Sequence, residues 1–149
     1  CGIPIGFMIA NSETQLPLAR WLNWLREKYL MPLSPKIMID CSATVMAAIE
    51  SSFKNPQIRL CNWHMIRALQ KQVSMKIKIS ISSEEQSIIQ ARRSAIKDFL
   101  ELMYSDTIDK FGQVWWEYRN KYAQHDEWLR YLIENWLKHP EKWWSGNSV

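Results

Sequence analysis

The stretch that decides the fold is residues 35–73, PKIMIDCSATVMAAIESSFKNPQIRLCNWHMIRALQKQV. Its first short apolar run, residues 36–39, ends on Asp40 and is followed by helical spacing over residues 42–53. A second short run, residues 57–60, leads into another helical pattern. Strands that alternate with helices at this spacing predict βαβ units and a largely parallel sheet.

Each of the two helical patterns has an apolar stripe at steps of three and four residues, as expected for a helix that covers a sheet. Ser42 is predicted to be the N-cap of the first helix, because its hydroxyl can accept from a backbone N–H in the first turn. The stripes are Val45, Met46, Ile49 and Phe53 in the first helix, and Met65, Ile66, Leu69 and Val73 in the second.

Upstream, residues 3–10 (IPIGFMIA) form an apolar, partly β-branched run. This composition predicts a strand that is buried on both faces. A helix is expected from Pro17 to Tyr29, because Pro17 suits a first turn and apolar residues follow at helical spacing.

The pattern changes near residue 74. Lys76 and Lys78 alternate with apolar residues up to Ile81, which indicates either a strand or an extended basic linker; we favour the linker. Ser82-Ser83-Glu84-Glu85 then has the serine and acidic residues that commonly start a helix. Three helices are expected over residues 88–103, over 108–122 with Asp106 as its cap, and over 128–136.

Composition fits one domain with a real core, since the chain has 149 residues, 47% hydrophobic and 23% charged. No apolar run approaches the ~20 residues that span a bilayer.

Lys and Arg exceed Asp and Glu by 19 to 15, which permits contact with nucleic acid without requiring it. Three cysteines form no disulfide framework, so a reduced, intracellular compartment is expected. Most of the nine tryptophans fall at helical spacing, which favours core packing over base stacking.

Asp40 is the strongest candidate for chemistry. A carboxylate that ends a hydrophobic strand can ligate Mg²⁺ or Mn²⁺, which prefer oxygen donors. The alternative is a turn or capping role at the strand end. The chain has only four glycines and no glycine-rich phosphate loop, so a nucleotide-binding function is not supported.

Cys61 and His64 form a C-x-x-H pair at a strand-to-helix turn, a spacing at which both side chains can reach one zinc ion. A structural zinc site needs four ligands, and no second such pair follows. A Cys–His nucleophile pair is a further alternative, but no residues suggest an oxyanion hole. The simplest interpretation is a core cysteine and a histidine that bonds to backbone at a helix N-terminus.

Residues 35–73 resemble the core of Mutator-like element (MULE) transposases. In that family a strand ending in Asp is followed by an A-x-x-A-I-x-x-x-F helix, then by R-x-C-x-W-H-x-x-R and a second helix. Weaker similarity extends over nearly the whole chain. The matching positions are Asp40, Ala43, Ala47, Ala48, Ile49, Phe53, Arg59, Cys61, Trp63, His64 and Arg67.

The resemblance implies an RNase H-like fold with a DDE triad that holds two divalent metals, Mg²⁺ or Mn²⁺, and cuts and joins DNA. Asp40 corresponds to the second acid. The family's first acid lies upstream of the matched region, and its final Glu follows a T-N-N segment further downstream. Because the match includes one acid of three, we expect a piece truncated at both ends and inactive alone.

The fold class expected from this resemblance is α/β and helix-rich: a partial RNase H-like core over residues 1–75, then an all-helical insertion over 76–149. The family's partner is DNA at transposon ends, so the resemblance implies a nuclear protein that does not bind a membrane. It also allows a homo-oligomer. In the family's strand order, residues 3–10 would lack their neighbouring strands, so the isolated chain is expected to be marginally stable or aggregation-prone.

A second hypothesis comes from the binding class. The chain would be a domesticated transposase remnant that binds DNA or protein. Its contacts would come from the basic residues Lys71, Lys76 and Lys78 and from exposed aromatic side chains. A third is a structural domain stabilised by zinc at Cys61 and His64.

Overall fold

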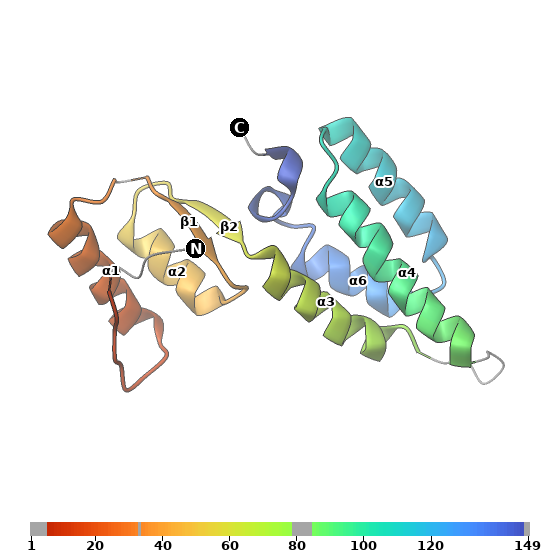
Figure 1. The fold of residues 1–149 in the computed structure, drawn as a ribbon, viewed down its shortest axis with the longest axis horizontal. Helices are drawn as coiled ribbons and strands as arrows, with labels where there is room; N and C mark the ends of the chain where they lie inside the picture. The colour runs from red at the N-terminus through yellow and green to blue at the C-terminus, as the bar shows by residue number, and fades with distance from the viewer. Residues whose placement is uncertain (1–5, 33, 79–84, 148–149) are drawn as a thin grey trace. The chain divides into compact units, whose positions relative to one another are not determined.

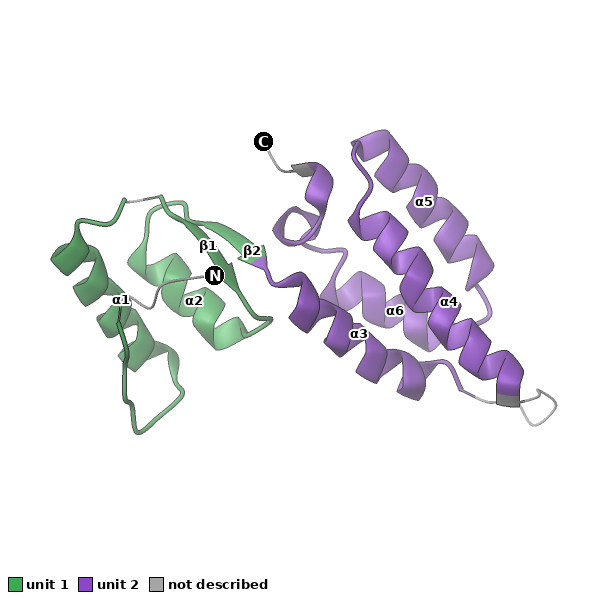
Figure 2. Cartoon of the chain, viewed as in Figure 1, with its two compact units in different colours: residues 1–59 green, residues 60–149 purple. Residues whose placement is uncertain are grey.

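The computed structural model describes residues 6–32, 34–78 and 85–147, and in these ranges it is rich in helix with one small sheet (Figure 1). The chain divides into two compact units, residues 1–59 and residues 60–149 (Figure 2). Within the described ranges, no helix is both long enough and apolar enough to cross a membrane.

The first unit contains the βαβ arrangement predicted from the sequence. Strand β1 (Lys36–Ile39) is followed by helix α2 (Ala43–Ser52) and strand β2 (Gln57–Leu60), and the two strands pair in a parallel sheet. The expected helix-rich α/β class is therefore confirmed. A parallel pair needs a crossover of this kind, because a tight hairpin can join only antiparallel strands.

Helix α1 (Gln15–Tyr29) and α2 supply the cover that a two-stranded sheet requires, since such a sheet is marginal alone. The centre of the packing is a buried cluster of Ile49, Phe53 and Ile58. Partly buried side chains from α1, the loop after it, α2 and β1 surround it: Leu22, Met31, Ile37, Ile39, Val45 and Met46. The stripe expected for α2 therefore faces the core.

Polar contacts fix the ends of these helices. Ser42 is the N-cap of α2, as predicted: its Oγ accepts from the Val45 N–H at 3.3 Å. Across the helix pair, the Arg26 guanidinium donates to the Ser52 carbonyl, and the buried Ser52 hydroxyl donates to the Ala19 carbonyl at 3.3 Å. These bonds hold α1 in place against α2.

The strand predicted over residues 3–10 is wrong for the part that the structure describes. Residues 6–10 have no regular secondary structure, and the side chains of Phe7 and Ile9 are 86% and 102% exposed. Residues 3–5 of that prediction lie outside the described residues. An apolar run needs a neighbouring strand to form a ladder, and the described sheet consists of β1 and β2 alone.

The second unit is helical. It contains α3 (Asn62–Lys76), α4 (Glu85–Met103), α5 (Ile108–Lys121) and α6 (Asp126–Asn135), followed by 3₁₀ turns at Pro140–Lys142 and Ser145–Asn147. Helix α4 packs against both α3 and α5, and α3 also packs against α6. The three helices expected after residue 83 are thus present, with their apolar faces inward.

Two boundaries differ from the sequence-based expectation. Helix α3 continues to Lys76, so residues 74–76 are neither strand nor extended linker, while residues 79–84, with Ser82, Ser83 and Glu84 of the expected helix start, lie outside the described residues. The N-cap of α5 is Thr107 rather than Asp106, because the Thr107 Oγ1 accepts from the Lys110 N–H at 3.2 Å.

A buried tyrosine joins three helices of the second unit. The Tyr118 hydroxyl, on α5, donates to the Ala95 carbonyl of α4 at 3.0 Å and accepts from Nε1 of Trp128, on α6, at 2.7 Å. Burial raises the pKa of Tyr118, so its hydroxyl stays protonated and keeps donating. The Tyr118 hydroxyl and the Trp128 indole N–H therefore both have hydrogen-bond partners.

Most tryptophans of the C-terminal half serve the core, as the helical spacing predicts. Trp128, Trp136, Trp143 and Trp144 are buried. The Trp144 Nε1 donates to the carbonyl of Ser105 at 2.7 Å, which ties the last turns of the chain to the end of α4. Trp116, on α5, is exposed.

We predict that Tyr118→Phe lowers the free energy of unfolding of the second unit by about 1–3 kcal/mol, because the buried Trp128 indole loses its acceptor. Urea unfolding followed by tryptophan fluorescence measures this, since seven of the nine tryptophans belong to that unit. The exposed Tyr104 provides the control, and Tyr104→Phe should change stability little. Equal stability of both variants would contradict the prediction.

Candidate functional site

Asp40 directly follows the last residue of β1, as predicted, and its side chain is exposed. Its Oδ1 accepts from the Ser42 N–H at 3.2 Å, so one carboxylate oxygen helps to start α2. The local sequence explains this placement: β1 ends at Ile39, and the polar Asp40-Cys41-Ser42 segment turns the chain into the helix. Asp40 is thus a carboxylate at the end of a strand, and it also stabilises the turn into α2.

Cys61 and His64 stand at the corresponding point after β2, where α3 begins. Cys61 is a partly buried free thiol in the N-cap position, and its side chain makes no capping hydrogen bond. His64 is exposed, and its ring lies edge-on to Trp63 with 4.7 Å between ring centroids. Asp40 belongs to the first unit and this pair to the second.

The donor set does not fit a metal pair. Across residues 6–32, 34–78 and 85–147, no three His, Cys, Asp or Glu side chains are grouped so that they could hold a metal ion. A two-metal centre needs several carboxylates to hold ions about 4 Å apart. Asp40 is a single carboxylate, and no catalytic step through metal is derived from it.

The three lysines predicted to bind DNA have different surroundings. Lys71 is exposed on α3. Lys76 lies over the Tyr131 ring, 5.5 Å from its centroid, and the Lys78 Nζ pairs with Glu127 Oε1 at 2.8 Å. That pairing lowers the pKa of Glu127. Lys76 and Lys78 therefore contact α6, and Lys71 is the one of the three without a contact of this kind.

Helix α3 also carries an exposed aromatic residue beside a cation. Trp63 is 58% exposed, and the guanidinium of Arg67 lies 4.7 Å from its ring centroid. Trp63, Arg67 and Lys71 are spaced by four residues, so they lie along one face of the helix. We call these three residues the α3 stripe. Arg67 was not among the DNA-binding residues predicted from the sequence, although its i, i+4 spacing to Lys71 could have indicated it.

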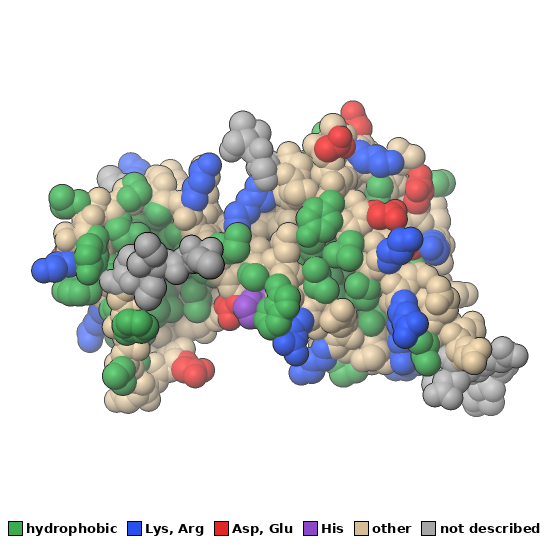
Figure 3. Space-filling view, viewed as in Figure 1, with side chains coloured by type: hydrophobic (Ala, Val, Ile, Leu, Met, Phe, Trp, Pro, Cys, Tyr) green, Lys and Arg blue, Asp and Glu red, His purple; other side chains and the backbone are tan. Residues whose placement is uncertain are grey.

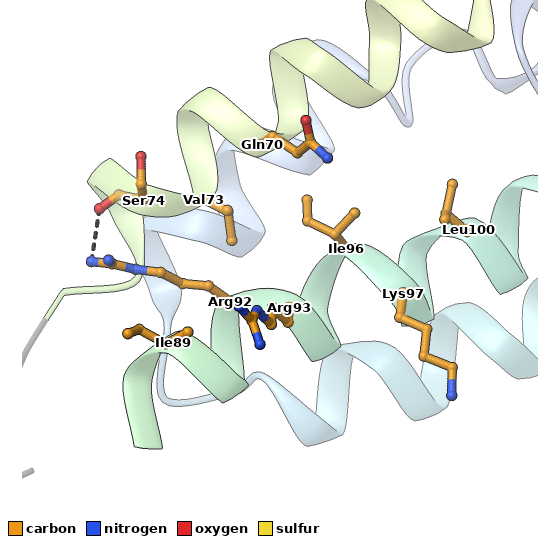
Figure 4. Close-up of a pocket in the computed structure, with 9 residues that line it drawn as sticks. All are labelled: Gln70, Val73, Ser74, Ile89, Arg92, Arg93, Ile96, Lys97 and Leu100. Carbon is orange, nitrogen blue, oxygen red and sulfur yellow. Dashed lines mark hydrogen bonds between the residues drawn. The ribbon is translucent and has the colours of Figure 1, made fainter. Parts of the chain in front are cut away.

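A groove with a volume of about 440 Å³ lies between α3 and α4 in the second unit. Aliphatic and basic side chains line it together, and Figure 4 shows Val73 and Ile96 directed toward each other across it. We call it the α3–α4 groove; its residues are Gln70, Val73, Ser74, Ile89, Arg92, Arg93, Ile96, Lys97 and Leu100. In Figure 3, lysine and arginine side chains lie among hydrophobic ones in this region.

The two adjacent arginines of the groove have different roles. Arg92 donates to the Ile77 carbonyl through Nε at 3.0 Å and through Nη2 at 2.8 Å. It also donates to the Ser74 carbonyl at 2.9 Å, the bond that Figure 4 shows as a dashed line. These carbonyls belong to the C-terminal end of α3, whose last carbonyls lack partners within the helix. Arg92 is therefore a cap for α3, whereas Arg93 is exposed at the groove.

The groove could not be found from the sequence, because its two walls come from different helices. The only local signal is the spacing of Arg93 and Lys97 beside apolar positions on α4, which also describes an ordinary solvated helix edge. No family model, curated protein or solved structure matches the chain.

We predict that Arg92→Met lowers the free energy of unfolding by about 1–3 kcal/mol, because the charged guanidinium bonds to the last carbonyls of α3 are lost. Arg93→Met is the matched control at the next position and should leave stability nearly unchanged. Urea unfolding and amide hydrogen exchange at residues 73–77 measure both effects. A similar loss in the two variants would contradict the capping role.

Proposed function

We propose that the chain is the central part of a MULE-type DDE transposase core, in which Asp40 is one of the metal-binding acids. The observation that supports this proposal is the position of Asp40 at the carboxyl end of β1 in a parallel βαβ unit, with Cys61-x-x-His64 starting the helix after β2. Open α/β sheets place their chemistry at the carboxyl ends of strands. DNA at transposon ends, in the nucleus, is the partner that this role implies.

In this proposal the chain's residues have limited roles. Asp40 would contribute one carboxylate to a divalent metal, whose chemistry is to activate water or a DNA 3′-OH for attack on a phosphodiester. Its bond to the Ser42 N–H orients the carboxylate at the start of α2. Cys61 and His64 match the family's sequence motif, and no catalytic role is proposed for them. The fold proposed for residues 1–75 is the partial RNase H-like core that the resemblance implies.

The same chemistry requires that the chain be inactive by itself. One carboxylate cannot position two metal ions and neutralise the attacking and leaving oxygens together. The remaining acids of the proposed triad would have to come from sequence outside these 149 residues.

The flanking coding sequence tests the family assignment. We expect a strand ending in Asp upstream and a T-N-N-x-x-E segment downstream. In a protein that includes them, Asp40→Asn should abolish Mg²⁺-dependent cleavage of transposon-end DNA, whereas Glu27→Gln, on an exposed acid of α1, should not. Mg²⁺-dependent nicking by the 149-residue chain alone, lost on Asp40→Asn, would contradict the inactivity.

A second candidate function is DNA binding without cleavage, as expected of a domesticated remnant. The α3 stripe supports it, because an exposed Trp63 with Arg67 on its ring and Lys71 one turn further along combines a stacking surface with phosphate-binding charge. Lys78, by contrast, is paired with Glu127.

If the α3 stripe binds single-stranded DNA, affinity should fall steeply with salt, and Lys71→Gln should reduce the slope of log K against log salt by about 1. Lys78→Gln is the matched control and should change the slope less, because its charge is already compensated. Trp63→Ala should weaken binding by about 1–3 kcal/mol through lost stacking. Fluorescence anisotropy with a labelled oligonucleotide measures all three. Salt-independent binding, or equal effects of the two lysine variants, would exclude this function.

A further inference from the structure

We propose that the α3–α4 groove binds an acidic amphipathic helix of a partner protein. The apolar side chains of that helix would enter the groove, and its carboxylates would pair with Arg93 and Lys97. The proposal concerns the second unit and does not depend on the role of Asp40.

The groove has the size and the partly apolar lining of a binding site. Its volume of about 440 Å³ falls within the range of roughly 300–1,000 Å³ typical of ligand sites. Four aliphatic side chains line it: Val73, Ile89, Ile96 and Leu100. Ile89 is 42% exposed, so the groove leaves a large apolar side chain in contact with solvent. Burying such surface against a partner is favourable.

The charge at the groove has one sign. Among the described residues that line it, Arg92, Arg93 and Lys97 are charged and none is acidic. The acids of α4 that lie near these cations in sequence, Asp98 and Glu101, line a different depression on the α5 side. The charges of α4 are thus separated between its two faces.

Two of the three cations at the groove can bind a partner. Arg92 is occupied by the Ser74 and Ile77 carbonyls. None of the ion pairs among the described residues includes Arg93 or Lys97, whereas Asp98 on the opposite side is paired with Lys121 at 2.7 Å. Arg93 and Lys97 are four residues apart, so they present two charges along one side of the groove.

This combination fits a peptide helix better than nucleic acid. An amphipathic helix offers apolar anchors at i, i+3/i+4 and i+7 for an aliphatic groove, and acidic residues beside them for the cations. Binding of single-stranded nucleic acid relies on aromatic side chains on which bases stack. None of the described residues that line the groove is aromatic, and the exposed Trp63 is not among them.

The test starts from a displayed library of helical peptides of about 15 residues, a length at which helices become stable in water, selected against the intact chain. We expect enrichment of peptides with apolar residues at i, i+4 and i+7 flanked by Asp or Glu. Failure to enrich any peptide, or enrichment of basic or uncharged ones, would overturn the proposal.

Variants then locate the site, with affinities from fluorescence anisotropy of the selected peptide. Ile89→Asp should weaken binding by about tenfold or more, because it places a carboxylate beside the apolar anchors and the peptide's acids. Ile89 is partly exposed, so this variant should keep the fold, which circular dichroism checks. The double variant Arg93→Gln/Lys97→Gln should weaken binding by about tenfold and reduce its salt dependence.

The matched control is Lys110→Gln/Arg119→Gln, which removes two exposed cations of α5 outside the groove. It should leave affinity unchanged. Binding that survives Ile89→Asp, or falls equally in the control, would place the peptide elsewhere and overturn the proposal. A single-stranded oligonucleotide that displaces the peptide and loses affinity in Ile89→Asp would show that the occupant is nucleic acid instead.

Discussion

The hydroxyl of Tyr118 is the constraint on which the helical unit depends. This one group of α5 bonds at once to a carbonyl of α4 and to an indole of α6. A buried donor or acceptor without a partner costs about 1–3 kcal/mol, so any shift of one helix that breaks either bond is opposed. The Tyr118 hydroxyl thus helps to fix α4, α5 and α6 relative to one another, and α4 also forms one wall of the α3–α4 groove.

The parts of the fold that could be predicted are those that local physics determines. The period of apolar residues in α1, α2 and α3 identifies each helix, and the hydroxyl of Ser42 identifies where α2 starts. The two short runs next to α2 are then expected to be strands joined by a helix, a connection that allows the parallel pair that the structure shows. The position of Asp40 at the end of β1 follows from the same argument, before any resemblance is considered.

The parts that could not be predicted depend on partners distant in sequence. Residues 6–10 have the composition of a buried strand, but a strand forms only where another backbone pairs with it. Helix α3 continues to Lys76 because Arg92, 15 residues after Ile77, bonds its final carbonyls. Arg92 caps a helix, whereas the neighbouring Arg93 lies exposed at a groove. Helical spacing places Arg92 in line with the buried Ile88, Ala95 and Phe99, but the α3 carbonyls to which it donates cannot be identified from any local pattern.

The same reasoning explains why charge counts alone carry little functional information here. The net charge of +4 is modest. Lys76 and Lys78, which belong to the basic segment identified in the sequence, lie against Tyr131 and Glu127. What can act on a partner is charge that the fold leaves uncompensated next to a surface of matching chemistry. Arg93 and Lys97 meet that condition beside aliphatic side chains, and Arg67 with Lys71 meets it beside Trp63. The two surfaces differ in whether their apolar component is aliphatic or aromatic, and on that difference rests our proposal of a peptide for one and single-stranded DNA for the other.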